Sequence, residues 1–230
     1  MKTQRKSSPL SLCALFLALL TGCQQAAQPV NRQSATQPTA TRRGSIPSAS
    51  GQFDYYLLTL SWAPEYCHGH PNSPECDGSH RGFVVHGLWP QFQNGRWPSD
   101  CSSAPGLADP STMLDIMPDP RLIAHEWQKH GTCTGLTANQ YFGVVRSAYA
   151  SIKIPRSLIN PARTTQRGAT EIKQLFASAN PGISADGMAI RCHNRYLAGV
   201  EFCLGKSLRP VSCQGVRDCD QPSIRIPAAP

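Results

Sequence analysis

The chain has 230 residues with 22 basic and 14 acidic side chains, a formal net charge of +8. Six of the basic residues and none of the acidic ones precede residue 52, so the rest of the chain has 16 basic residues and a net charge of +2. The basic balance is thus mainly a property of the N-terminal region and is not by itself evidence for a nucleic-acid partner. About 180 residues remain for one domain with an ample core, which excludes a multidomain array.

Residues 1–22 have the features of an export signal. Three basic residues precede the apolar stretch Leu10–Leu20, which is too short for a comfortable membrane span. The stretch ends in Leu-Thr-Gly before Cys23, a pattern that resembles the lipobox of bacterial lipoproteins, where cleavage precedes a cysteine that becomes lipidated. An ordinary secretory signal with an incidental cysteine is the alternative. We expect a lipoprotein signal peptide, lipidation at Cys23, and a bacterial envelope location, on a membrane facing the periplasm or the outside.

Residues 23–51 consist mainly of Gln, Ala, Pro, Ser and Thr. Such a stretch buries too little apolar surface to offset the entropy lost on ordering. We therefore expect a disordered tether, followed by a single folded domain over residues 52–230.

The domain begins with an expected strand over Tyr55–Trp62, which Pro64 ends. Residues 64–81 have the Pro and Gly content of a loop, and a strand carrying His86 follows. Residues 90–110 are expected to form a polar loop containing Trp97, and Ser111 to cap a short helix that ends before Pro118.

Asp119 and Pro120 are a good start signal for the next helix, which is expected to stop at Gly131. Thr137 opens another helix, and residues 168–179 form a third with one apolar face. Three strands follow, at Met188–Cys192, Tyr196–Cys203 and Ile224–Ile226. Helices and strands do not alternate regularly, so the prediction is an α+β fold, a single domain with a central, mostly antiparallel sheet packed against helices.

Residues 125–133, HEWQKHGTC, concentrate ionisable groups on the helix that begins near Asp119. With His125 at zero on an ideal helical wheel, Lys129 lies near 40°, Glu126 near 100° and His130 near 140°, all approximate. The four side chains share one arc. A solvent-exposed helix face would also collect charged side chains. From this helix alone, a functional site and a solvated face are therefore equally good interpretations.

Residues 83–90, FVVHGLWP, form a second unusual segment. His86 interrupts an apolar run with the length of a buried strand, and Gly87 permits a close backbone approach. A lone histidine here favours a core residue bonded to a carbonyl. One histidine on a strand and two on a helix can instead face each other across a cleft.

The two segments together resemble the active-site motifs of the ribonuclease T2 family, whose members are secreted or compartmentalised enzymes that cleave RNA. The resemblance covers roughly residues 52–227 and implies a metal-independent endoribonuclease acting on single-stranded RNA through 2′,3′-cyclic phosphate ends. It implies His130 as general base, His86 as general acid, His125 as phosphate ligand, and Glu126 and Lys129 as stabilisers of the transition state. Histidine suits both proton-transfer roles because its ordinary pKa is about 6.5.

Trp89 matches a family position that stacks on a nucleobase, although a core tryptophan is an equally good interpretation from the sequence. Gln91 stands where some relatives place an acidic base-reading residue, which puts the base preference in doubt.

Eight cysteines lie beyond Cys23, an even number that indicates four disulfides in an exported chain. Composition alone allows roughly 105 different pairings of eight cysteines. The family resemblance implies the pairs Cys67–Cys76, Cys101–Cys133, Cys192–Cys219 and Cys203–Cys213. A zinc site is the competing use of these residues, and the absence of a CxxC pair counts against it.

Two other functions compete with the ribonuclease. A zinc hydrolase would use His125, Glu126 and His130, but metalloprotease helices place their histidines four residues apart rather than five. A binding protein on a ribonuclease scaffold would be marked by loss of a catalytic histidine, and all three are present. We expect no cofactor and no metal, RNA as the substrate, a membrane contact through the lipid, and a monomer without an obligate protein partner.

Overall fold

The computed structural model describes residues 45–46, 49–77, 82–219 and 221–229. The expected signal peptide, the lipidation site at Cys23 and most of the expected tether lie outside these ranges. All described residues belong to one compact unit, Arg42–Pro230. Within the described ranges, no helix combines the length and the apolar character that a membrane span needs.

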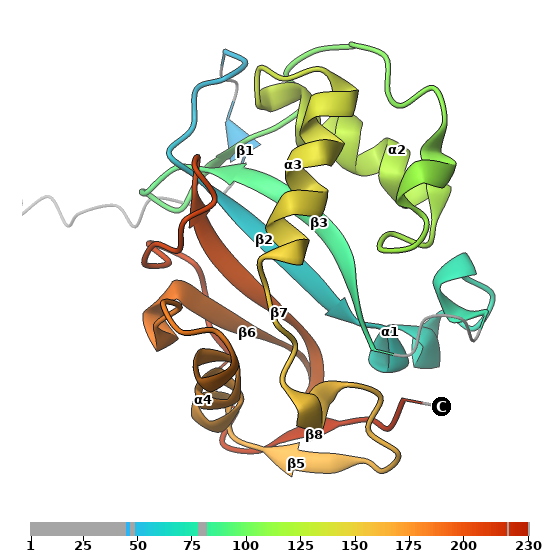
Figure 1. Cartoon of the computed structure of the whole chain (residues 1–230), viewed down its shortest axis with the longest axis vertical. Coiled ribbons are helices and arrows are strands. Elements are labelled where there is room, and N and C mark those ends of the chain that lie inside the picture. The colour runs from blue at the N-terminus through green and yellow to red at the C-terminus, as the bar shows by residue number, and fades with distance from the viewer. Residues whose placement is uncertain (1–44, 47–48, 78–81, 220, 230) are drawn as a thin grey trace, which may run out of the picture. The chain divides into compact units, whose positions relative to one another are not determined.

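The main sheet has the strand order β3-β2-β7-β8-β5, with β6 paired to β7 (Figure 1). All its pairings are antiparallel except the single-residue contact of β7 with β8. The fold is therefore α+β with a mostly antiparallel sheet. Its strands are β2 (Tyr55–Trp62), β3 (Phe83–Gln91), β5 (Thr165–Arg167), β6 (Met188–His193), β7 (Tyr196–Gly205) and β8 (Ile224–Ile226).

Helices cover part of this sheet and one of its ends. In Figure 1, α3 crosses in front of β2 and β3, while α4 lies beside β6. The α-helices are α1 (Ala63–Gly69), α2 (Pro120–Lys129), α3 (Ala138–Ala150) and α4 (Ala169–Ala179). Single turns of 3₁₀-helix lie at Pro74–Cys76, Pro110–Met113, Gly131–Cys133, Arg156–Leu158 and Ala185–Gly187.

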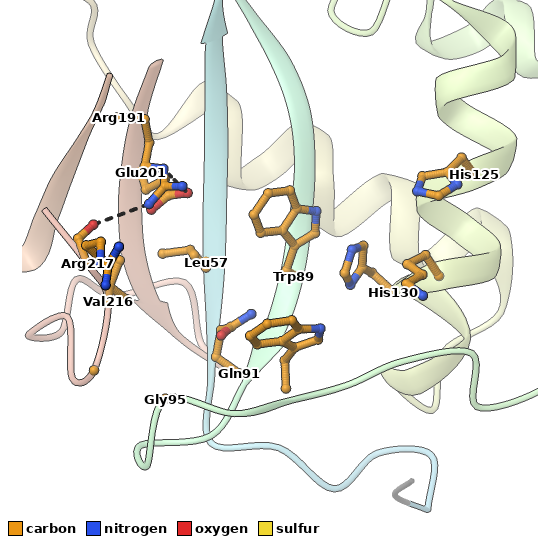
Figure 2. A pocket seen from close by; sticks show the side chains of 13 residues that line it. Leu57, Trp89, Gln91, Gly95, His125, His130, Arg191, Glu201, Val216 and Arg217 are labelled. Carbon is orange, nitrogen blue, oxygen red and sulfur yellow. Dashed lines mark hydrogen bonds and ion pairs between the residues drawn. The ribbon is translucent and has the colours of Figure 1, made fainter. Parts of the chain in front are cut away.

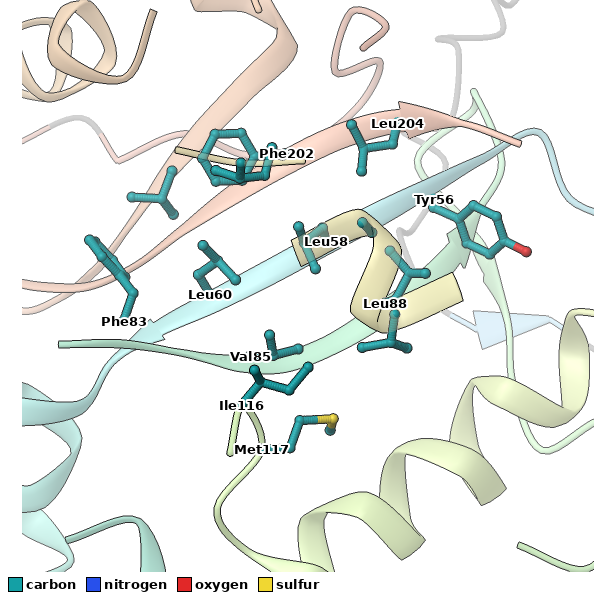
Figure 3. Close-up of a cluster of buried hydrophobic side chains, with 14 of the residues drawn as sticks. Tyr56, Leu58, Leu60, Phe83, Val85, Leu88, Ile116, Met117, Phe202 and Leu204 are labelled. Carbon is teal, nitrogen blue, oxygen red and sulfur yellow. The ribbon is translucent and has the colours of Figure 1, made fainter. Parts of the chain in front are cut away.

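Alternation along β2 separates a core face from a second face. Leu58, Leu60 and Trp62 are fully buried in the main hydrophobic core. Figure 3 shows side chains of this core along β2, β3 and β7. Leu57 belongs to a separate small cluster with Tyr55, against which Trp89 packs. The two-residue period of a strand thus leaves one face of the sheet free for a site.

Four disulfides hold the domain: Cys67–Cys76, Cys101–Cys133, Cys192–Cys219 and Cys203–Cys213. These are the pairings that the family resemblance implies. The Cys101–Cys133 bridge joins the loop after β4 (Trp97–Pro98) to the turn that follows α2.

Two predictions about the loops were wrong. The segment expected to be a loop over residues 64–81 includes most of α1 and a 3₁₀ turn. Pro64 lies in the first turn of α1, where proline is favoured, instead of only ending a strand. The short helix near residue 111 is capped by Asp109, whose side chain accepts from the Ser111 amide at 2.9 Å, and not by Ser111.

Contacts with the domain begin before the expected boundary at residue 52. Strand β1 (Ser45–Ile46) pairs in parallel with β4 (Trp97–Pro98). The Gly51 amide donates to the Cys133 carbonyl at 2.8 Å. The end of the expected tether is therefore part of the folded structure near the end of α2.

Candidate active site

A β-bulge aims His86 out of the core. Val85 pairs with Leu60 and Gly87 pairs with Thr59, so His86 is the extra residue on β3. Bulges let consecutive side chains point to the same face, which is why Val85 and Leu88 both reach the core while His86 does not. The imidazole Nδ1 of His86 lies 3.2 Å from Oγ of Ser61 on β2.

Helix α2 presents the second set of side chains. Asp119 caps its N-terminus by accepting from the Arg121 amide at 2.8 Å, as expected from the sequence. The helix ends at Lys129, and His130 follows with non-helical backbone angles. Glu126 and His130 are buried, whereas His125 is exposed. The ideal helical wheel placed these side chains on one arc but did not predict which of them are buried.

Glu126 connects the strand to the helix. Its Oε2 accepts a 2.6 Å hydrogen bond from Nε1 of Trp89, and its Oε1 lies 3.6 Å from Nε2 of His86. Only 1 % of the residue is exposed, and this burial raises the pKa of Glu126 to about 8, against the lowering effect of the Trp89 hydrogen bond. A β-carbon at Gly87 would lie 2.0 Å from Oε2, so only glycine fits beside this carboxyl group.

Trp89 contacts both predicted catalytic histidines. Its ring centroid lies 5.5 Å from that of His86, nearly perpendicular, and 5.2 Å from that of His130. Burial, and then the charge of His125, lower the pKa of His86. Burial, followed by His125 and Lys129, lowers the pKa of His130 to about 3. His130 is therefore neutral over the whole physiological range.

Lys129 is held by a residue that the sequence did not single out. Its Nζ donates to Oδ2 of Asp100 at 2.8 Å, and the Asp100 amide donates to the Lys129 carbonyl at 3.0 Å. Asp100 has a positive φ of 54° and precedes Cys101, which is bridged to Cys133. In the sequence, the sign that Asp100 could position Lys129 is its place before Cys101, a cysteine expected to form a disulfide.

A cavity of about 530 Å³ extends from these side chains across the sheet (Figure 2). His125, Lys129, His130 and Trp89 line one end, and Arg191, Glu201, Val216 and Arg217 line the other. Leu57, Gln91 and Trp97 lie in its wall as well. No sequence signal singles out Ser61, Arg191 or Glu201, because strand pairing between distant segments places Ser61 beside His86 and the other two at the cavity.

The described residues contain no group of three or more His, Cys, Asp and Glu side chains arranged to hold a metal ion. Glu126 faces His86 on β3, while His125 is exposed. The helical His-Glu-His arrangement of a zinc hydrolase is thus not formed by His125, Glu126 and His130.

Comparison with known proteins gives one consistent result. The ribonuclease T2 family pattern matches residues 53–213. A ribonuclease from Aeromonas hydrophila is 34 % identical over 167 residues, which cover 68 % of this chain and 74 % of that protein.

Two solved structures share the fold. An RNase-related protein from Calystegia sepium covers 78 % of this chain and 99 % of its own, with a TM-score of 0.67 at 23 % identity. RNase NT in complex with 5′-AMP covers 77 % of this chain and 99 % of its own, with a TM-score of 0.56 at 25 % identity.

Proposed function

The chain belongs to the ribonuclease T2 family and is an endoribonuclease of that type, and on this basis we propose how it works. It cleaves single-stranded RNA by transphosphorylation, without a metal ion, and leaves a 2′,3′-cyclic phosphate and a 5′-hydroxyl. The observation that carries the proposal is the placement of His86 and His130 next to the same ring, that of Trp89, with Glu126 beside His86.

In the proposed reaction the RNA supplies its own nucleophile. His130 takes the proton from the 2′-hydroxyl, and the 2′-oxygen attacks the adjacent phosphorus. The bond to the 5′-oxygen breaks, and His86 gives that oxygen its proton. The lowered pKa of His130 keeps its imidazole neutral, which is the form that a base needs. The Glu126 carboxyl, 3.6 Å from His86, holds a proton that it can pass to the acid.

The remaining side chains act on the phosphate and the substrate. His125 is exposed at the cavity and serves as the phosphate ligand, while Lys129 and Glu126 stabilise the charge that develops at phosphorus. Trp89 provides a ring surface for a nucleobase, in the way that single-stranded RNA is commonly bound. Gln91 lies in the same cavity wall.

Product analysis tests this reaction. We expect purified protein to cleave RNA in the presence of EDTA and to release cyclic phosphate ends, while DNA and an RNA with a single 2′-deoxy sugar at the scissile step stay intact. His86→Ala and His130→Ala should each lower kcat by about 10²–10⁴. The double variant should lose no more than either single one, because the two residues act in one transition state.

A different outcome would revive the metal hydrolase. Cleavage of the 2′-deoxy substrate, or 5′-phosphate ends that depend on added metal, would contradict an attack by the 2′-oxygen. Glu171→Gln, which changes an exposed carboxylate on α4, is the matched control and should keep full activity.

We also propose that the protein is exported and anchored by lipid at Cys23, after removal of residues 1–22, with residues 23–51 as the connecting segment. Four disulfides are typical of an oxidising compartment. Mass spectrometry of the mature N-terminus tests the anchor. Cys23→Ser should release the protein from the membrane fraction or leave the precursor uncleaved, and an unmodified wild-type N-terminus would contradict the proposal.

A further inference from the structure

The cavity continues well past the catalytic side chains to a charged wall. Arg191 lies on β6, Glu201 on β7 and Arg217 in the loop between Cys213 and Cys219. Figure 2 shows Leu57 between this wall and Trp89, so the two ends of the cavity are joined by an apolar floor. A substrate group that leaves the catalytic end along this floor meets Glu201 and Arg191.

Glu201 is in an unusual position for a carboxylate. It occupies the middle of the sheet, paired with Thr59 on β2, and is only 4 % exposed. Its partner among the described residues is Arg191, whose Nε lies 3.5 Å from Oε1. Arg191 also donates from Nη1 to the Arg217 carbonyl at 3.4 Å, which fixes the guanidinium at the cavity wall.

Such an ion pair is poorly explained by stability alone. The carboxylate of Glu201 is buried, whereas the Arg191 side chain is 47 % exposed, so the ion pair returns little of the desolvation cost of Glu201. Thr59, opposite Glu201, adds a buried hydroxyl that has no partner in the described structure. Polar groups kept in this way at a cavity are candidates for ligand recognition.

The position of the cavity determines which nucleoside enters it. His130, the proposed base, lines the cavity, whereas His86, the proposed acid, does not. The base removes the proton of the 2′-hydroxyl, so the sugar beside His130 belongs to the nucleoside on the 5′ side of the cleaved bond. Its nucleobase extends over Trp89 and Leu57 toward Glu201.

The chemistry of the wall fits one base edge best. A carboxylate accepts two parallel hydrogen bonds, and guanine offers adjacent N1–H and N2–H donors together with an O6 acceptor for arginine. Adenine, cytosine and uracil each lack one part of this set. We propose that Glu201 and Arg191 form a recognition site for guanine on the 5′ side of the cleaved bond, an inference that depends on the proposed ribonuclease function.

Four dinucleoside monophosphates, GpC, ApC, CpC and UpC, test the site. The assay is run at pH 8, because burial raises the pKa of Glu201 to about 7, with Asp218 adding to this effect and Arg191 opposing it. A bidentate pair discriminates by about 1–3 kcal/mol, so kcat/KM for GpC should exceed the other three by roughly tenfold or more. Glu201→Gln should remove that advantage and change UpC cleavage by less than about threefold.

Arg191→Gln should also weaken the preference for GpC. This variant provides a second test if Glu201→Gln folds poorly. Glu171→Gln, an exposed carboxylate outside the cavity, is the matched control and should keep the wild-type preference. An equal loss on all four substrates with a lower Tm would overturn the proposal and leave Glu201 a structural residue.

A binding measurement separates this inference from the catalytic one. Calorimetry with His86→Ala should show tighter binding of 3′-GMP than of 3′-AMP, and a second change, Glu201→Gln, should abolish the difference. Equal affinity for the two nucleotides would overturn guanine recognition even if the enzyme cleaves RNA. Failure of all four dinucleotides to react, with selective 3′-GMP binding retained, would instead count against the proposed cleavage.

Discussion

Glu126 links helix α2 to strand β3 through its carboxyl group. Burial raises its pKa to about 8, and burial also lowers the pKa of His86, which lies 3.6 Å away. The two shifts reverse the usual order of proton affinity in the pair, so below about pH 8 the proton lies on Glu126. For His86 to act as the acid, the carboxyl group has to pass this proton to it.

This coupling predicts the pH dependence of kcat/KM. The pair keeps its last proton up to about pH 8, so activity should fall as the pH rises through that value. On the acidic side, activity should persist until His130 is protonated, near pH 3. In Glu126→Gln only His86 holds the proton, and the alkaline limb should move below pH 6.5. If the alkaline limb of the Glu126→Gln profile stays at the wild-type pH, another group supplies the proton.

At the scale of elements, the loop closed by Cys101–Cys133 sets the position of Lys129. The disulfide holds Cys101, the residue after Asp100, against the turn that follows α2. Asp100 forms its ion pair with Lys129 at the same place. Both side chains are more than a third exposed, so the ion pair contributes less than about 1 kcal/mol to stability. Its effect is mainly to direct the ammonium group.

Asp100→Asn should therefore lower kcat by about three- to tenfold, with little change in Tm, because a misplaced charge costs rate more than stability. Stopped assays on an RNA dinucleotide and a thermal melt give the two values. Asp115→Asn is the matched control, since it removes a similar exposed ion pair, with Arg146, outside the cavity. Equal kinetic effects of the two substitutions would contradict a positioning role for Asp100.

The sequence predicted the elements that carry strong local signals. Asp119 and Pro120 start α2, Thr137 caps α3, and Ile224–Ile226 forms β8, as expected. Strands β1, β4 and β5 have only two or three residues and lack the paired isoleucines that mark the equally short β8. The wall formed by Arg191 and Glu201 was also missed, because it depends on the register between β2, β6 and β7 and not on neighbouring residues.

At the scale of the whole molecule, the domain buries carboxyl groups that prefer to be neutral. Glu75 is 4 % exposed, and its Oε1 has no partner in the described structure. Burial raises the pKa of Glu75 to about 7, and the nearby Asp119 adds to the effect. Because the folded state holds this proton more tightly than the unfolded chain, its contribution to stability is full below about pH 4.5 and is lost as the pH rises through about 7.

Glu75→Gln should remove this loss. The variant should match wild type below about pH 4.5 and exceed its free energy of unfolding by about 1–3 kcal/mol at pH 8. Urea unfolding at the two pH values measures the difference. Glu171→Gln, at an exposed site, should show no such divergence, and a Glu75 variant less stable than wild type at pH 8 would contradict the argument.

The bulge at His86 means that the chain has one residue more than the ladder needs. Without residue 86, Val85 would still pair with Leu60 and Gly87 with Thr59, so Leu88 would stay in the core and Trp89 at the cavity. A single-codon deletion of His86 should therefore abolish catalysis and largely preserve folding. Deletion of Leu88 should instead move Trp89 toward the hydrophobic interior and disrupt folding.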